Sequence, residues 1–134
     1  MGPCKSIKDY GHRLDADGNP EIKDCQRWAF PVYYNSPESF AVFGALYSNK
    51  YNLQDKFFSY WQVVSNRLSG NKYVIGYDPI NEPLPSNPIR DPFLILPGRF
   101  DQEQLDPLYS KLFKIYDKNS VSRTDPNIMF FEPG

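Results

Sequence analysis

The sequence has 134 residues and a mass of 15.6 kDa, the size of one ordinary domain. Its 15 Lys and Arg residues balance 16 Asp and Glu residues, and a net charge of −1 argues against nucleic acid as the main partner. The 10 Phe, 10 Tyr and 2 Trp residues exclude a disordered tail.

The sequence shows no pattern typical of a membrane span, a signal peptide or a metal site. Apolar runs such as 93–96 are far below the roughly 18 residues that a transmembrane segment needs. The N-terminus lacks the central apolar stretch of a signal peptide. Cys4 and Cys25 are too few for a disulfide scaffold, and no C-x-x-C pattern indicates zinc. We therefore expect no metal and no cofactor.

The first 35 residues read as a loop region. They are polar and rich in turn formers, and residues 17–20 (Asp-Gly-Asn-Pro) predict a turn. From residue 36 onward the pattern becomes more regular, so we treat 1–134 as a fragment of a single domain, with a loop region, 1–35, followed by a helix-helix-strand-loop-helix-strand portion, 36–134.

Two helices are predicted next. Ser36 followed by Pro37 is typical of a helix start, because the serine side chain caps the helix and proline fits its first position. A second helix begins after Asn52 and ends before Gly70. Its apolar residues recur every three or four positions, at Leu53, Phe57, Trp61, Val64 and Leu68.

The remaining pattern predicts strand, loop, helix and strand. Residues 73–80 are short, apolar and β-branched or aromatic, as expected of a buried parallel strand. A long proline-rich loop spans 81–102, a helix starts near Asp101, and 128–131 form a second buried-strand pattern that ends at Glu132. Which of Tyr77 and Asp78 would face the interior is left open, since alternate strand residues point to opposite sides.

This order of elements implies an α/β fold with helical crossovers between parallel strands. Both predicted strands are apolar on both faces, so each requires neighbours that the sequence does not contain. We therefore expect a slice of a larger sheet.

The sharpest motif is Asn81-Glu82-Pro83, directly after the first predicted strand. Catalytic side chains of a (β/α)8 barrel project from that end of its strands. A carboxylic acid there can protonate a leaving glycosidic oxygen, and a neighbouring amide can hold a sugar hydroxyl. The motif therefore points to glycoside hydrolysis.

The chain resembles glycoside hydrolase family 5. The resemblance covers about residues 25–134 and rests on 58–68, on Gly70-Asn71, on 74–78 and on Asn81-Glu82-Pro83. Within the family, Leu53-Gln54-Asp55, Gly76-Tyr77-Asp78 and 130–133 are most similar to endoglycosylceramidases.

The resemblance implies a retaining hydrolase on a partial (β/α)8 TIM barrel, covering about strands 4 and 5. Glu82 matches the acid/base and Asn81 the preceding amide, whereas the nucleophile, a second Glu, has no counterpart here. Glu132 matches a fifth-strand position and is a candidate for substrate binding. The implied substrate is the glycan–ceramide linkage of glycosphingolipids. A β-glucanase or cellulase of the same family, and a truncated, non-catalytic carbohydrate-binding protein, remain alternatives.

Two further regions are candidates for substrate contact. Trp28 belongs to an aromatic group that would either stack on sugars or pack its own loop. The apolar run Phe93, Leu94, Ile95 and Leu96 follows the motif and would either meet a lipid tail or be buried under its loop.

The resemblance also bears on compartment and activity. Relatives suggest a secreted or lysosomal enzyme, in which Cys4 and Cys25 would be bridged, although two free thiols fit the sequence nearly as well. Because the nucleophile has no counterpart, we expect residues 1–134 alone to be inactive and marginally folded.

Overall fold

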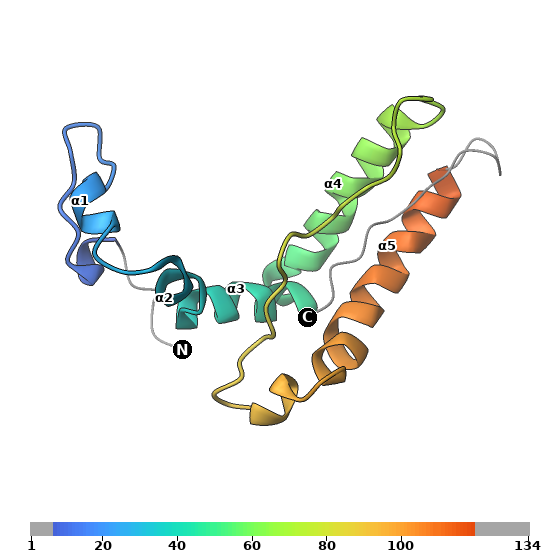
Figure 1. The fold of residues 1–134 in the computed structure, drawn as a ribbon. Helices are drawn as coiled ribbons and strands as arrows, with labels where there is room; N and C mark the ends of the chain where they lie inside the picture. The colour runs from blue at the N-terminus through green and yellow to red at the C-terminus, as the bar shows by residue number, and fades with distance from the viewer. Residues whose placement is uncertain (1–6, 120–134) are drawn as a thin grey trace.

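The computed structural model describes residues 7–119, and within them the chain is helical (Figure 1). No helix in this part of the chain is long and apolar enough to cross a membrane. In chain order the elements are η1 (Lys8–Tyr10), α1 (Ile22–Cys25), α2 (Phe30–Tyr34), α3 (Pro37–Tyr47), η2 (Lys50–Asn52), α4 (Leu53–Leu68), η3 (Pro92–Ile95), η4 (Asp101–Leu105) and α5 (Asp106–Asn119).

The predicted helices are confirmed. The hydroxyl of Ser36 accepts a hydrogen bond from the main-chain N–H of Ser39 at 3.2 Å, and Pro37 is the first residue of α3. Helix α4 has the predicted bounds, and Gly70 just beyond it has a φ of 73°, the left-handed conformation that ends helices. The third predicted helix is present as η4, which has π-helical geometry, continued by α5.

The prediction of an α/β fold, a partial (β/α)8 barrel, is wrong for the described residues, which contain no sheet. Residues 73–80 do not form a strand of a sheet; they run as an irregular segment along α4 (Figure 1). The side chain of Tyr77 packs between Trp61 of α4 and Tyr116 of α5. The second predicted strand, 128–131, lies outside the described residues.

The apolar pattern of 73–80 predicted a strand that is buried on both faces, but only part of the segment is buried. Tyr73 is 80% exposed and Ile75 is 71% exposed, whereas Tyr77 is buried and the following Asp78 is exposed. Of Tyr77 and Asp78, Tyr77 is therefore the residue that enters the core.

The core lies between α4 and α5, which run in the same direction because 69–100 returns the chain along α4 (Figure 1). Three rings join its parts. Tyr77 stacks on Tyr116 of α5 with ring centroids 4.8 Å apart, and Trp61 of α4 stands edge-on to both. The buried members of the core are Leu46, Tyr77, Phe100, Leu105, Leu108, Tyr109, Leu112 and Tyr116.

Candidate functional site

The Asn81-Glu82-Pro83 motif begins a loop that emerges from this core. Asn81 and Glu82 are exposed, so their polar side chains face solvent, whereas the following Pro83 is buried and anchors the loop. Glu82 has a φ of 45°, in the left-handed region that residues with a Cβ atom seldom adopt. Such a conformation costs about 1–2 kcal/mol relative to a right-handed one, so contacts elsewhere must hold it.

Two tyrosine hydroxyls bond to main-chain carbonyls of this loop. Tyr34, the last residue of α2, donates to the carbonyl of Glu82. Tyr47, the last residue of α3, donates to the carbonyl of Leu84 at 2.8 Å. Burial is the main cause that raises the pKa of Tyr47 above its ordinary value, and the nearby Tyr109 and Tyr34 raise it further. The Tyr47 hydroxyl therefore keeps its proton and remains a donor.

The far end of the loop is fixed by α3 and η4. The side chain of Gln104 accepts from the main-chain N–H of Ser86 at 2.9 Å and donates to the Ser86 hydroxyl at 2.7 Å. Gly44 of α3 approaches so closely that an added Cβ would lie 3.1 Å from the Ser86 Cβ. We call residues 81–86 the clamped loop, because side chains from α2, α3 and η4 form hydrogen bonds with its backbone.

Trp28 lies elsewhere, on an aromatic pocket of the N-terminal segment. The pocket has a volume of about 440 Å³, within the range of small-ligand sites. Trp28 itself is 53% exposed. The lining residues are Ile7, Tyr10, His12, Pro20, Cys25, Trp28, Phe30 and Tyr33.

Two rings connect this aromatic pocket to the clamped loop. Phe30, which lines the pocket, stacks on Tyr34 with ring centroids 5.1 Å apart and an interplanar angle of 21°. Tyr34 in turn donates to Glu82. The pocket and the candidate acid are therefore linked by direct contacts along one short helix, α2.

A buried carboxylate fixes the segment that carries the pocket. Asp24 accepts from the main-chain N–H of Arg13 at 2.7 Å and from its guanidinium at 3.0 and 3.1 Å, and Arg27 adds a bond at 3.2 Å. These bonds from Arg13 lower the pKa of Asp24 to about 2. The Asp24 carboxylate thus joins Arg13 to α1 and stabilises the wall of the aromatic pocket.

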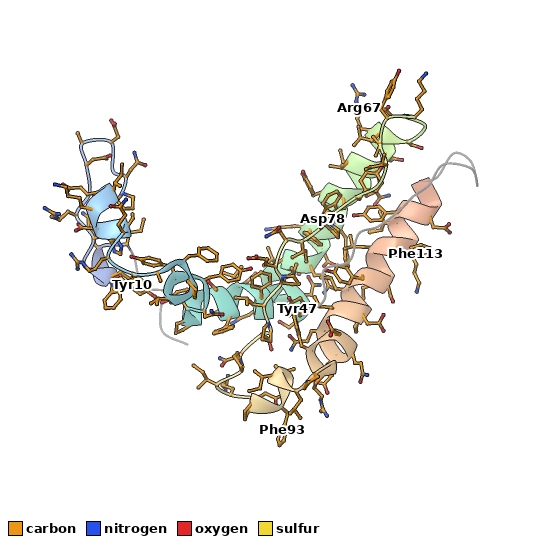
Figure 2. The ribbon with its side chains drawn as sticks, viewed as in Figure 1. Tyr10, Tyr47, Arg67, Asp78, Phe93 and Phe113 are labelled. Carbon is orange, nitrogen blue, oxygen red and sulfur yellow. The ribbon has the colours of Figure 1, made fainter. Side chains whose placement is uncertain are left out.

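The apolar run after the motif is partly buried and partly exposed. Leu94 is buried, whereas Phe93, Ile95 and Leu96 are 63%, 68% and 51% exposed. They lie on and beside η3, with Phe93 at the end of the molecule away from the tips of α4 and α5 (Figure 2). We call these three exposed residues the apolar tip.

The clamped loop is held by residues that no sequence motif indicated. Tyr34, Tyr47 and Gln104 lie far from Asn81-Glu82-Pro83 along the chain, and no local pattern predicts their hydrogen bonds with the main chain of the loop. Glu132 and Cys4 lie outside the described residues. Cys25 is exposed, and its pairing with Cys4 stays a prediction.

No cluster of side chains suited to binding a metal ion is present within 7–119. This part of the chain holds no group of three His, Cys, Asp or Glu side chains arranged to bind an ion. The carboxylate of Glu82 and the amide of Asn81, both exposed, are instead groups that can exchange a proton and donate a hydrogen bond to a bound sugar.

The chain is similar to two curated proteins named endoglycoceramidase. The one from Cyanea nozakii is 36% identical over 97 residues, which are 72% of this chain and 19% of the relative. The one from Hydra vulgaris is 33% identical over 97 residues, with the same shares. This chain thus spans about a fifth of the length of these relatives.

This similarity confirms the resemblance to endoglycosylceramidases, while membership of glycoside hydrolase family 5 stays a prediction. No family model matches the chain. No solved structure matches it either.

Proposed function

We propose that this chain contributes the acid/base end of a retaining glycosidase site that cleaves the glycan–ceramide linkage of glycosphingolipids. The observation that carries the proposal is the exposed Asn81-Glu82 pair on a loop whose backbone is clamped by α2, α3 and η4. The similarity to proteins named endoglycoceramidase supports it and favours this substrate over the plant-type glucans of a cellulase.

In the proposed reaction Glu82 acts twice. As an acid it protonates the glycosidic oxygen while a carboxylate nucleophile attacks the anomeric carbon, so that the ceramide leaves as an alcohol and a glycosyl-enzyme ester forms. As a carboxylate it then takes a proton from water, which attacks the same carbon and releases the glycan with its original anomeric configuration. Asn81 donates its amide hydrogen bond to the sugar, and the nucleophile belongs to another part of the site.

A fixed loop backbone suits this double role, because the carboxyl group of Glu82 must approach the glycosidic oxygen from one direction. A group held near the reacting atoms contributes through orientation, and a displacement of about 1 Å can cost 10²-fold in rate. We propose that the aromatic pocket around Trp28 stacks against a sugar ring of the glycan and that the apolar tip meets the lipid.

Substitution of Glu82 in the complete protein tests the proposal. Glu82→Gln removes the transferable proton and should lower hydrolysis of a natural glycosphingolipid by about 10²–10⁴-fold. A fluorogenic aryl glycoside, whose leaving group needs little protonation, should lose less in its first step. Asp117→Asn, which removes an exposed carboxyl on α5, is the control and should keep wild-type rates.

Azide rescue makes the assignment specific. In Glu82→Ala, azide should enter the vacated space, attack the glycosyl-enzyme without base assistance and give a glycosyl azide of the same anomeric configuration as the substrate. An azide of inverted configuration would place Glu82 as the nucleophile. Full activity of Glu82→Gln would remove Glu82 from the mechanism, and inactivity of the wild-type protein on both substrates would favour a carbohydrate-binding role.

A further inference from the structure

We propose that Tyr34 is a positioning residue for Glu82. Its hydroxyl holds the Glu82 carbonyl, keeps residue 82 in its left-handed conformation and thereby sets the direction of the carboxyl group. The inference rests on the proposed function of Glu82 and adds a residue, 48 positions earlier in the sequence, that does not itself touch the reacting atoms.

The conformation of Glu82 needs such support on both sides. A residue with a Cβ atom avoids a φ of 45°, and the residue before a proline is driven toward extended conformations. Pro83 is buried and fixes the chain after Glu82. The bond from Tyr34 fixes the carbonyl between them, so its loss would let residue 82 relax, and rotation about φ would swing the Cβ and the carboxyl away.

Tyr34 is well placed for this task because its own ring is fixed. It ends α2, a helix whose second residue is Pro31, and its ring stacks on Phe30. The donor therefore approaches the carbonyl from a rigid support. This is the requirement for orienting a neighbouring group, because a mobile donor would follow the loop and would not hold it.

The second tyrosine clamp supplies a matched control. Tyr47 also donates one hydroxyl hydrogen bond to a main-chain carbonyl of the clamped loop, but at Leu84, beyond Pro83. Tyr34→Phe and Tyr47→Phe therefore delete the same atom and the same type of bond. Only the first deletion frees the residue that carries the proposed acid.

The experiment compares both variants in the complete protein on a natural glycosphingolipid and on an aryl glycoside with an activated leaving group. Tyr34→Phe should lower kcat on the natural substrate by about 10- to 100-fold. Its KM should stay within about twofold, and its loss on the activated substrate should be smaller. Tyr47→Phe removes a bond on the other side of Pro83, so its loss of kcat on the natural substrate should be at least fivefold smaller than that of Tyr34→Phe.

A double variant separates positioning from general structural damage. In the Glu82→Gln background Tyr34→Phe should cause no further loss, because the group that it orients is already gone. The fall in kcat at high pH, which reports ionisation of the general acid, should remain in Tyr34→Phe at a lower maximum and should disappear in Glu82→Gln. If Tyr34→Phe does not fold, Phe30→Leu, which leaves the hydroxyl but removes its stacked support, should give a partial loss of the same kind.

Three results would overturn the inference: an unchanged kcat in Tyr34→Phe, an equal loss on both substrates, or a full additional loss in the Glu82→Gln background. These results are distinct from failure of the proposed function. That failure would appear as wild-type activity in Glu82→Gln itself, whatever Tyr34→Phe does.

Discussion

Lys111 of α5 donates a hydrogen bond from Nζ to Oε1 of Gln54 on α4 at 2.8 Å. The same Gln54 side chain donates from Nε2 to the carbonyls of Leu46 and Tyr47 at 3.0 and 3.2 Å. One buried amide therefore joins α4, α5 and the C-terminal end of α3. Since Tyr47 also reaches the clamped loop, the amide belongs to the scaffold that supports the candidate site.

Gln54→Met should destabilise the protein by about 1–3 kcal/mol, because it leaves buried helix-end carbonyls without that donor. Lys111→Met removes only a donor whose side chain reaches solvent, and it should cost less than about 1 kcal/mol. Urea unfolding followed by circular dichroism measures both. A smaller loss in Gln54→Met than in Lys111→Met would show that the carbonyls find other partners.

Gly44→Val should destabilise the protein by about 1–3 kcal/mol through overpacking. The contact at 3.1 Å from the added Cβ is to Ser86, which Gln104 holds by two hydrogen bonds, so the neighbour cannot readily move. Gly44→Ala should lose most of the roughly 1 kcal/mol gain that alanine normally brings to a helix interior. Thermal melts in wild-type and Ser86→Gly backgrounds test this, since removing the Ser86 Cβ should restore the gain.

Asp24→Asn should lower the melting temperature at pH 7, and the difference from wild type should shrink as the pH falls. The pKa of Asp24 is about 2 in the folded protein, against about 3.9 in an unfolded chain. Its contribution is therefore complete above about pH 4 and is lost as pH falls through about 2. Melts between pH 2 and 7 measure it, with exposed Asp17→Asn as a control. A pH-independent difference would contradict the role of ionised Asp24.

Leu112→Ala should cost about 2–5 kcal/mol, whereas Phe113→Ala should change stability by less than about 0.5 kcal/mol. Leu112 is 0% exposed in the core between α4 and α5, and its neighbour Phe113 is 52% exposed and points outward (Figure 2). Chemical unfolding of the two variants compares adjacent positions of one helix. Equal losses would show that the outer face of α5 is covered in the protein.

Replacing Phe93, Ile95 and Leu96 together by serine should reduce binding to vesicles that carry glycosphingolipid by about tenfold or more, because burying each such side chain is worth about 1.5–3 kcal/mol. Hydrolysis of a soluble aryl glycoside should not change. The control is the double variant Tyr73→Ser and Ile75→Ser, which removes exposed apolar side chains far from the apolar tip in the sequence. Equal effects from both variants would deny the apolar tip any special role.

Local sequence determined the start of α3 and both ends of α4, whereas the short helices η1, α1 and α2 lie in the part that the sequence predicted as a loop region. The cap at Ser36, the apolar spacing along 53–68 and Gly70 carried those predictions, because helix formation depends on contacts within a few residues. The Asn81-Glu82 pair was identified in the same way, and the resemblance that it supported agrees with the similarity to endoglycoceramidases.

Tertiary structure alone decided the course of 73–80 and the support of the motif. An apolar segment becomes a strand of a sheet only where another strand offers its backbone, and the described residues 7–119 form no sheet; the side chain of Tyr77 packs between α4 and α5. The hydrogen bonds that Tyr34, Tyr47 and Gln104 form with the clamped loop join residues 18 to 48 positions apart. Such bonds depend on how the helices pack, so no spacing along the chain predicts them, and it is the packing that holds the backbone of the clamped loop.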